Sequence, residues 1–147
     1  MLTYLLIAFV LLLAVAPLLH FRPSKRQRAL ARMREYAVLH GLQVEYRKLP
    51  TEQRGRRPVT GDVIYYGLRL TPDDRRATLK ACWIHEGGQW RSSGARVIPP
   101  QILNELPESV LVASVDEGGC GVYWTEAGGE AEIEIIREVL TRWAHTL

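Results

Sequence analysis

The sequence predicts an α+β protein, in which an N-terminal transmembrane helix precedes a mostly antiparallel sheet of about six strands with two main helices on one face. Three observations lead to this prediction. The chain opens on a long apolar run without charged residues, continues with short alternating segments separated by Gly, Pro and Asp, and ends on a strongly amphipathic segment. Because separate runs of strands and helices pack as segregated layers, this order is typical of α+β domains.

The apolar run extends from Leu2 to Leu19 and has no charged side chain in its 18 residues. As a helix it would be about 27 Å long, close to the hydrocarbon thickness of a bilayer. We interpret it as an uncleaved single span. The alternative is a secretory signal cleaved after Ala14–Ala16, but no Lys or Arg precedes the run and Pro17 would follow the cut. A buried core helix is disfavoured because the run is apolar on every side.

The distribution of charge divides the rest of the chain. Residues 22–57 contain 11 Lys and Arg against three acidic residues, whereas residues 58–147 contain eight against 13. The sequence therefore predicts a transmembrane anchor over 1–21, a basic juxtamembrane amphipathic helix over 22–41 and an α+β cytoplasmic domain over 42–147. Because positively charged flanks stay in the cytoplasm, the expected topology is a single pass with the N-terminus outside and the domain in the cytoplasm.

Basic residues after the span are the candidate contacts with the membrane or with a partner. They are Arg22, Lys25, Arg26, Arg28, Arg32, Arg54, Arg56 and Arg57. Anionic lipid headgroups attract such cations by about 1 kcal/mol each, and Leu2–Leu19 would contact the bilayer itself. The alternative is a stop-transfer flank that only sets the topology.

A helix is predicted from Lys25 to His40. Ser24 and Gln27 have the spacing of a capping box, and Gly41 can end the helix. Its apolar residues form one stripe with cations on the opposite side, so one side can be buried while the other faces headgroups. The stripe consists of Ala29, Leu30, Met33, Tyr36 and Ala37.

Six segments between residues 42 and 125 have the alternation or composition of strands. They are Leu42–Leu49, Val63–Leu70, Thr78–His85, Gln89–Arg91, Val110–Val115 and Cys120–Thr125. Gly87-Gly88 predicts a hairpin between the third and fourth segments, Thr71–Asp74 predicts a turn, and Pro50–Gly61 reads as a polar loop. A short helix is expected over Pro99–Leu106.

The last predicted helix, Glu130–Thr146, has the clearest amphipathic pattern. Its apolar stripe consists of Ile133, Ile136, Val139, Leu140, Trp143 and Leu147. Acidic residues at its start suit the helix dipole, and Glu138 and Arg142 have the spacing of an i,i+4 ion pair. The four tryptophans are expected to pack in or around the core.

Residues with catalytic or metal-binding chemistry are few. Cys82 and His85 could supply two zinc ligands, with Cys120 and His145 completing a tetrahedral set. Residues three apart in a strand point to opposite faces, which argues against this site and against a Cys–His nucleophile. Both cysteines are instead expected to be buried and reduced. The sequence thus predicts no catalytic residue, no cofactor and no metal.

Short stretches of the chain resemble known families. Arg54–Pro58 is similar to the Arg-Gly-Arg-Pro core of AT-hook DNA-binding segments, with an extra Arg before the Pro. We favour an exposed basic loop there, so nucleic acid is not an expected partner. The apolar span followed by Phe21–Gln27 is similar to the membrane-proximal segment of the YajC-type accessory subunit of the bacterial preprotein translocase.

The chain as a whole resembles small uncharacterised bacterial single-pass inner-membrane proteins. The matching motifs are Pro-Ser-x-Arg-Gln after the span, Gly-Leu-x-Val after the next helix and Tyr-Trp-x-Glu before the last helix. Here they stand at Pro23–Gln27, Gly41–Val44 and Tyr123–Glu126. This resemblance implies an inner-membrane location and no known activity.

The expected function is that of a non-catalytic cytoplasmic domain, anchored in the membrane, that acts as a protein-interaction or accessory subunit of a membrane complex. Its partner would be another membrane protein. Two alternatives stay open. The basic segment could bind or sense anionic lipid or nucleic acid, which requires steep salt dependence. An enzyme of unrecognised type would use Cys82, His85 or Cys120.

Overall fold

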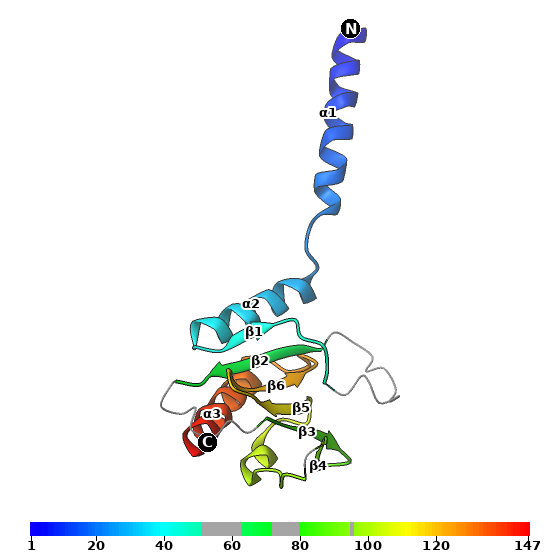
Figure 1. Ribbon diagram of the computed structural model, residues 1–147. Coiled ribbons are helices and arrows are strands. Elements are labelled where there is room, and N and C mark those ends of the chain that lie inside the picture. Colours follow the sequence, from blue (N-terminus) through cyan, green and yellow to red (C-terminus); the bar gives the residue numbers. More distant parts are fainter. Residues whose placement is uncertain (51–62, 72–79, 95) are drawn as a thin grey trace. The chain divides into compact units, whose positions relative to one another are not determined.

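The computed structural model describes residues 1–50, 63–71, 80–94 and 96–147, which form two compact units, Met1–Arg32 and Met33–Leu147 (Figure 1). Apart from Pro50, the predicted loop over Pro50–Gly61, with Arg54, Arg56 and Arg57, lies outside the described residues, as does most of the predicted turn over Thr71–Asp74. Each unit is described on its own below.

The first unit begins with helix α1 (Leu2–His20), which contains the whole predicted apolar run. Helix α2 (Lys25–Leu39) follows after four residues. The predicted capping box is present at its start, because the Ser24 hydroxyl accepts from the Gln27 amide at 3.2 Å and the Gln27 side chain accepts from the Ser24 amide at 2.9 Å. The boundary between the two units falls inside α2, at Arg32 and Met33.

The second unit contains one six-stranded sheet in which every neighbouring pair is antiparallel. The strand order is β1-β2-β6-β5-β3-β4. The strands are β1 (Gln43–Glu45), β2 (Ile64–Arg69), β3 (Ala81–Glu86), β4 (Gln89–Ser92), β5 (Val110–Val115) and β6 (Gly119–Trp124). Between β4 and β5 runs the short 3-10 helix η3 (Gln101–Glu105), and helix α3 (Glu130–Thr146) ends the chain. The predicted α+β class and its six strands are confirmed.

One face of the sheet carries the main core. Its strands contribute buried side chains such as Tyr66, Trp83 and Trp124, and α3 contributes the stripe Ile133, Ile136, Val139, Leu140 and Trp143. Met33 and Ala37 of α2 belong to the same buried cluster, and Leu42 follows them directly. Because α2 ends on this cluster, the compact unit begins within the helix and not at residue 42. Gly41, with φ of +87°, allows the tight exit from α2 that the sequence predicts.

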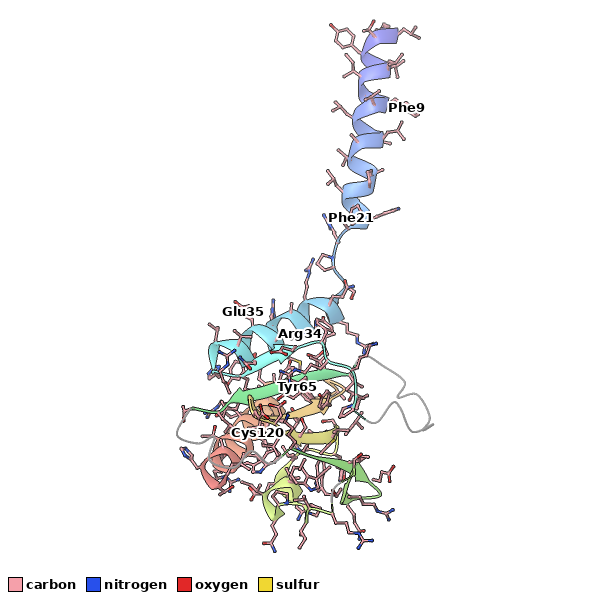
Figure 2. All side chains as sticks on the ribbon, viewed as in Figure 1. Phe9, Phe21, Arg34, Glu35, Tyr65 and Cys120 are labelled. Atoms are coloured by element: carbon pink, nitrogen blue, oxygen red, sulfur yellow. The ribbon has the colours of Figure 1, made fainter. Side chains whose placement is uncertain are left out.

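The opposite face of the sheet holds a smaller cluster built around Tyr65 (Figure 2). The Tyr65 ring lies across two paired glycines, since a Cβ added at Gly67 or Gly121 would come within 2.5 Å or 2.3 Å of the ring atoms. The guanidinium carbon of Arg47 lies 4.1 Å from the ring centroid on this side. The two glycines are therefore required by the tyrosine that covers them.

Three local expectations were wrong. Arg142 forms its ion pair with Glu105 of η3, not with Glu138, because the short 3-10 helix places a carboxylate beside the end of α3. Strand β1 spans only three residues instead of Leu42–Leu49. Cys82 is half-buried, because it points to the less covered face, whereas Cys120 is fully buried as expected.

We expect Trp143→Ala to lower the free energy of unfolding by about 3–5 kcal/mol, because a large buried ring leaves a cavity when it is removed. Trp143 is 1% exposed and packs edge-on against Trp83 with ring centroids 5.6 Å apart. Chemical denaturation monitored by circular dichroism measures the loss. Ile135→Ala, on the exposed side of the same helix, is the control and should cost far less. Equal losses for the two variants would contradict the docking of α3.

Candidate membrane-contact segment and its attachment to the domain

Helix α1 is long and apolar enough to cross a membrane, with a mean hydropathy of 2.7 over 18 residues. None of its residues is buried in the structure. A helix that is apolar on every side would expose a continuous hydrocarbon surface if it stood in water, which soluble domains avoid. A signal sequence at the N-terminus would pass the same test of length and composition.

Five predicted contact residues of the first unit, Arg22, Lys25, Arg26, Arg28 and Arg32, are all exposed. No acidic residue occurs before Glu35. None of the ion pairs found among the described residues includes these five cations. The other three predicted contacts, Arg54, Arg56 and Arg57, lie outside the described part of the chain.

Arg34, only two residues beyond Arg32, has a different environment. Its Nε donates to Oε1 of Glu126 at 2.9 Å and its Nη2 donates to Oε2 at 2.7 Å, so the guanidinium binds the carboxylate with two parallel bonds. Its Nη1 donates to the Tyr46 hydroxyl at 2.7 Å. The Tyr66 hydroxyl completes the group by donating to Glu126 Oε1 at 2.8 Å. We call these four residues the Glu126 cluster.

The Glu126 cluster joins α2 to the end of β6 and to the neighbouring strands. The Glu126 side chain is 2% exposed and that of Arg34 is 27% exposed, so the carboxylate is buried and the arginine closes it off from solvent. The hydrogen bonds to Glu126 raise the pKa of Arg34, and burial together with the bond to Glu126 raises the pKa of Tyr66. Arg34 therefore stays charged and Tyr66 stays a neutral donor over the physiological range.

The backbone of Glu126 has φ of +53°, the left-handed region that residues other than glycine seldom adopt. This turn directs the side chain back towards α2 immediately before Gly128 and Gly129 lead into α3. Strain of this kind persists only where surrounding contacts hold it, and here three donors do so. The sequence analysis noted Glu126 only as the end of the Tyr-Trp-x-Glu motif. Nothing in its local pattern indicates a buried partner in α2.

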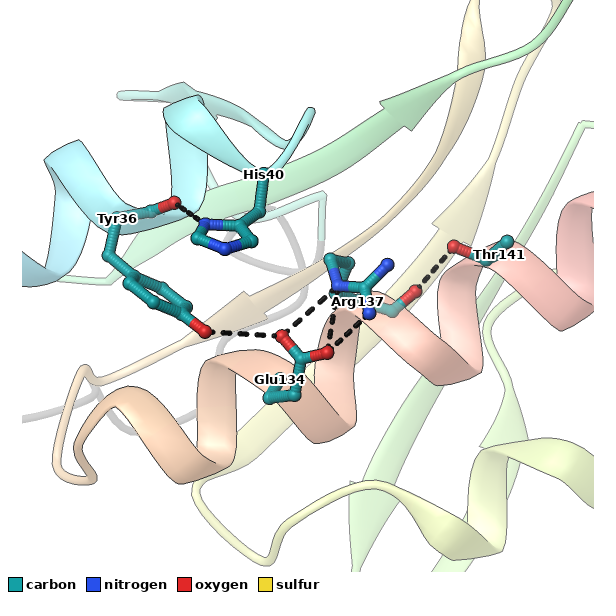
Figure 3. A network of polar contacts seen from close by, with 5 residues as sticks. All are labelled: Tyr36, His40, Glu134, Arg137 and Thr141. Atoms are coloured by element: carbon teal, nitrogen blue, oxygen red, sulfur yellow. Dashed lines mark hydrogen bonds and ion pairs between the residues drawn. The ribbon is translucent and has the colours of Figure 1, made fainter.

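A second set of polar contacts joins α2 to α3 at the surface (Figure 3). The Tyr36 ring stacks on His40 with centroids 4.0 Å apart, and its hydroxyl donates to Glu134 at 3.4 Å. Glu134 also accepts from Arg137, which lowers the pKa of Glu134. Because the Glu134 and Arg137 side chains keep more than a third of their surface exposed, their ion pair adds little stability. They hold the end of α2 beside the first turns of α3.

The residues considered for catalysis or zinc are not brought together. Cys82 belongs to the cluster on the Tyr65 face, whereas Cys120 lies in the main core, with its thiol 3.7 Å from the Leu140 carbonyl. His85 stacks on Trp90 across the β3–β4 hairpin. Within the described ranges, no group of three His, Cys, Asp or Glu residues could hold a metal ion. Burial raises the pKa of Cys82 and raises that of Cys120 to about 12, which disfavours the nucleophilic thiolate.

Comparisons with known proteins do not assign a family. A scan against protein-family models gives no match, and neither the curated proteins nor the solved structures contain a matching chain. The resemblances suggested by the short motifs therefore stay predictions, and the candidate segment is argued from its own residues.

We expect Arg34→Gln to lower the free energy of unfolding by about 3 kcal/mol, because it leaves the buried Glu126 carboxylate without its charged partner. Urea denaturation measures the loss in the free energy of unfolding. Faster hydrogen exchange of the α2 amides would show that the loss occurs at this helix. Arg28→Gln, an exposed arginine of the same helix, is the control and should change stability by less than about 0.5 kcal/mol.

The double variant Arg34→Gln/Glu126→Gln separates loss of the ion pair from loss of packing. It should cost less than the two single changes added together, because it leaves no uncompensated charge. Additive costs, or an Arg34→Gln variant as stable as Arg28→Gln, would show that the cluster does not hold α2.

Alkaline pH should destabilise the domain in part through Cys120. Its pKa rises from 9.0 to about 12 on burial, so between these values the unfolded chain loses a proton that the folded chain keeps. Stability is therefore full below pH 9 and falls as the pH rises, by at most about 1.4 kcal/mol per pH unit for one proton. Cys120→Ser removes this titration, and its stability should fall less steeply with pH in urea denaturation. If stability falls equally steeply with pH in the natural chain and in Cys120→Ser, ionisation of Cys120 does not contribute to the alkaline destabilisation.

Proposed function

We propose that this chain is a single-pass protein of the bacterial inner membrane. Helix α1 crosses the bilayer, the N-terminus lies outside and the domain lies in the cytoplasm. The observation that carries the proposal is that, among the residues that the structure describes, every buried core side chain lies between Met33 and Ala144. Because the domain completes its core without α1, the exposed apolar surface of that helix serves something other than the fold, and a bilayer is the medium that suits it.

The orientation is supported by the charges that follow α1. Arg22, Lys25, Arg26 and Arg28 lie within nine residues of His20, whereas no Lys or Arg precedes the helix. Moving such a cluster across the membrane potential costs about 2.3 kcal/mol per charge per 100 mV.

Within this location, we propose a non-catalytic role as an interaction or accessory subunit of a membrane complex. A single span confines the domain to a thin layer beside the bilayer, which raises its effective concentration towards other membrane proteins without any new contact. The separation of Cys82 and Cys120 onto opposite faces of the sheet supports this role over thiol chemistry.

Two reporters fused after Leu147 should give opposite results. A reporter that is active only outside the cytoplasm should be silent, and one that is fluorescent only inside it should be bright, because the basic flank keeps the domain in the cytoplasm. As the control, the same fusions are made on a variant with Arg22, Lys25, Arg26 and Arg28 changed to Gln and two Lys inserted after Met1, which should reverse the pattern.

A signal from the external reporter on the natural chain would overturn the orientation. Intact mass of the membrane fraction tests the span itself. A chain that retains Met1–Ala16 and stays with the membrane after a high-salt wash supports an anchor, whereas loss of that segment would identify a cleaved signal. The accessory role is tested separately by crosslinking in intact membranes, where repeated failure to trap any membrane protein would count against it.

A further inference from the structure

Helix α2 presents an outer side that combines cations with exposed apolar residues. Met33 and Ala37 face the core, and a helical repeat of 3.6 residues places Arg28, Arg32 and Leu39 on the other side of the same helix. Val38 and Leu39 are 57% and 75% exposed, which is unusual for two successive large apolar residues at the end of a surface helix. We call Arg28, Arg32, Val38 and Leu39 the outer side of α2.

The rotation of α2 about its axis is fixed by contacts within the domain. Arg34 is held by Glu126 and Tyr46 on one flank, and Tyr36 is held by Glu134 on the other. With Met33 and Ala37 buried between these two contacts, the part of α2 that belongs to the second unit cannot turn Val38 and Leu39 towards the core. The outer side therefore stays available to something beyond this domain.

Two properties of the chain indicate what covers the outer side. Only Phe21–Ser24 separate α1 from α2, so even a fully extended connection spans about 14 Å. The exposed cations of this region are opposed by a single acidic residue of α2, Glu35, which is exposed on the outer side itself, so Arg28 and Arg32 exceed it there by one charge. A polybasic segment so close to a span lies within reach of the headgroups, where the negative surface potential acts over about one Debye length.

We propose that the outer side of α2 binds the surface of a bilayer that contains anionic phospholipid. Arg28 and Arg32 contact lipid phosphates, and Val38 and Leu39 reach the boundary between headgroups and acyl chains, as in interfacial helices. The inference rests on the proposed span of α1. It goes further by assigning α2 a direct lipid contact, and it gives the Glu126 cluster the role of holding the correct side of the helix outward.

The test uses the full chain reconstituted in lipid nanodiscs with and without phosphatidylglycerol. Leu39→Cys is labelled with bimane in a Cys82→Ser background, since Cys120 is fully buried, and quenching by headgroup-nitroxide lipid reports contact. Ile98→Cys is the matched control, because Ile98 is equally exposed but follows β4 at the far edge of the sheet from β1. Emission from the buried tryptophans confirms that each variant is folded.

We expect the label at residue 39 to be quenched in phosphatidylglycerol discs at low salt, less in high salt, and always more than the label at residue 98. Arg28→Gln/Arg32→Gln should lower the ratio of bound to unbound helix about 30-fold, given the attraction of each cation to an anionic surface. Arg91→Gln/Arg96→Gln removes the same charge from exposed residues beyond β3 and should leave the quenching unchanged.

Equal quenching at residues 39 and 98, or quenching that ignores both anionic lipid and the Arg28/Arg32 change, would overturn the lipid contact. A DNA duplex that binds the chain more tightly than phosphatidylglycerol discs at the same salt would overturn it in favour of nucleic acid. Co-elution of the chain with discs reports the α1 span independently, so a failed span and a failed α2 contact are distinguishable.

Discussion

The packing of α3 against the central strands is the interaction on which the domain depends. One helix supplies Ile133, Ile136, Val139, Leu140 and Trp143 to a single buried cluster. The strands beneath it, β2 and β6, pair over six residues without interruption. Because the larger buried cluster lies on this face of the sheet, most of the buried apolar side chains are found there, and the hydrophobic contribution to stability scales with the apolar area removed from water. Elements at the margins, such as α2 and η3, add to this core and do not replace it.

Electrostatics acts on the fold through specificity more than through stability. A buried ion pair such as Arg34–Glu126 gains little over an apolar replacement of the same shape, since both charges lose their hydration. What the pair does is exclude other positions for α2, because any rotation or slip of the helix would leave a buried carboxylate unpaired. The left-handed backbone of Glu126 serves the same end by aiming the carboxylate at α2. The exposed contacts of Figure 3 add a second point of attachment without burying charge.

The sequence predicts the elements whose patterns are long and periodic. The bounds of α3 follow from its apolar stripe, and the start of α2 follows from the capping box of Ser24 and Gln27. The β3–β4 hairpin follows from Gly87 and Gly88, whose positive φ values its tight turn requires. These signals are local, so no knowledge of the tertiary structure is needed to interpret them.

Contacts between distant segments could not be predicted in the same way. Arg34 and Glu126 are 92 residues apart, and an arginine in a basic stretch gives no sign that it differs from its neighbours. Arg142 forms its ion pair with Glu105 because η3 lies beside the end of α3. The i,i+4 spacing of Glu138 and Arg142 gives no information about this tertiary contact. The short β1 has a similar cause, since alternation favours a strand but pairing with β2 decides how much of it forms.

The tyrosine that covers Gly67 and Gly121 has a consequence for how this domain can change over time. Its ring takes the place of two side chains, so the tyrosine and the glycines behave as one unit drawn from two strands. A larger residue at either glycine would displace the ring and, with it, the guanidinium of Arg47 stacked above. Tyr65, Gly67 and Gly121 can therefore be replaced only in a coordinated way, because a single substitution at any of them gives a less well packed domain. The buried Tyr65 ring and its two glycines are therefore expected to change together or not at all.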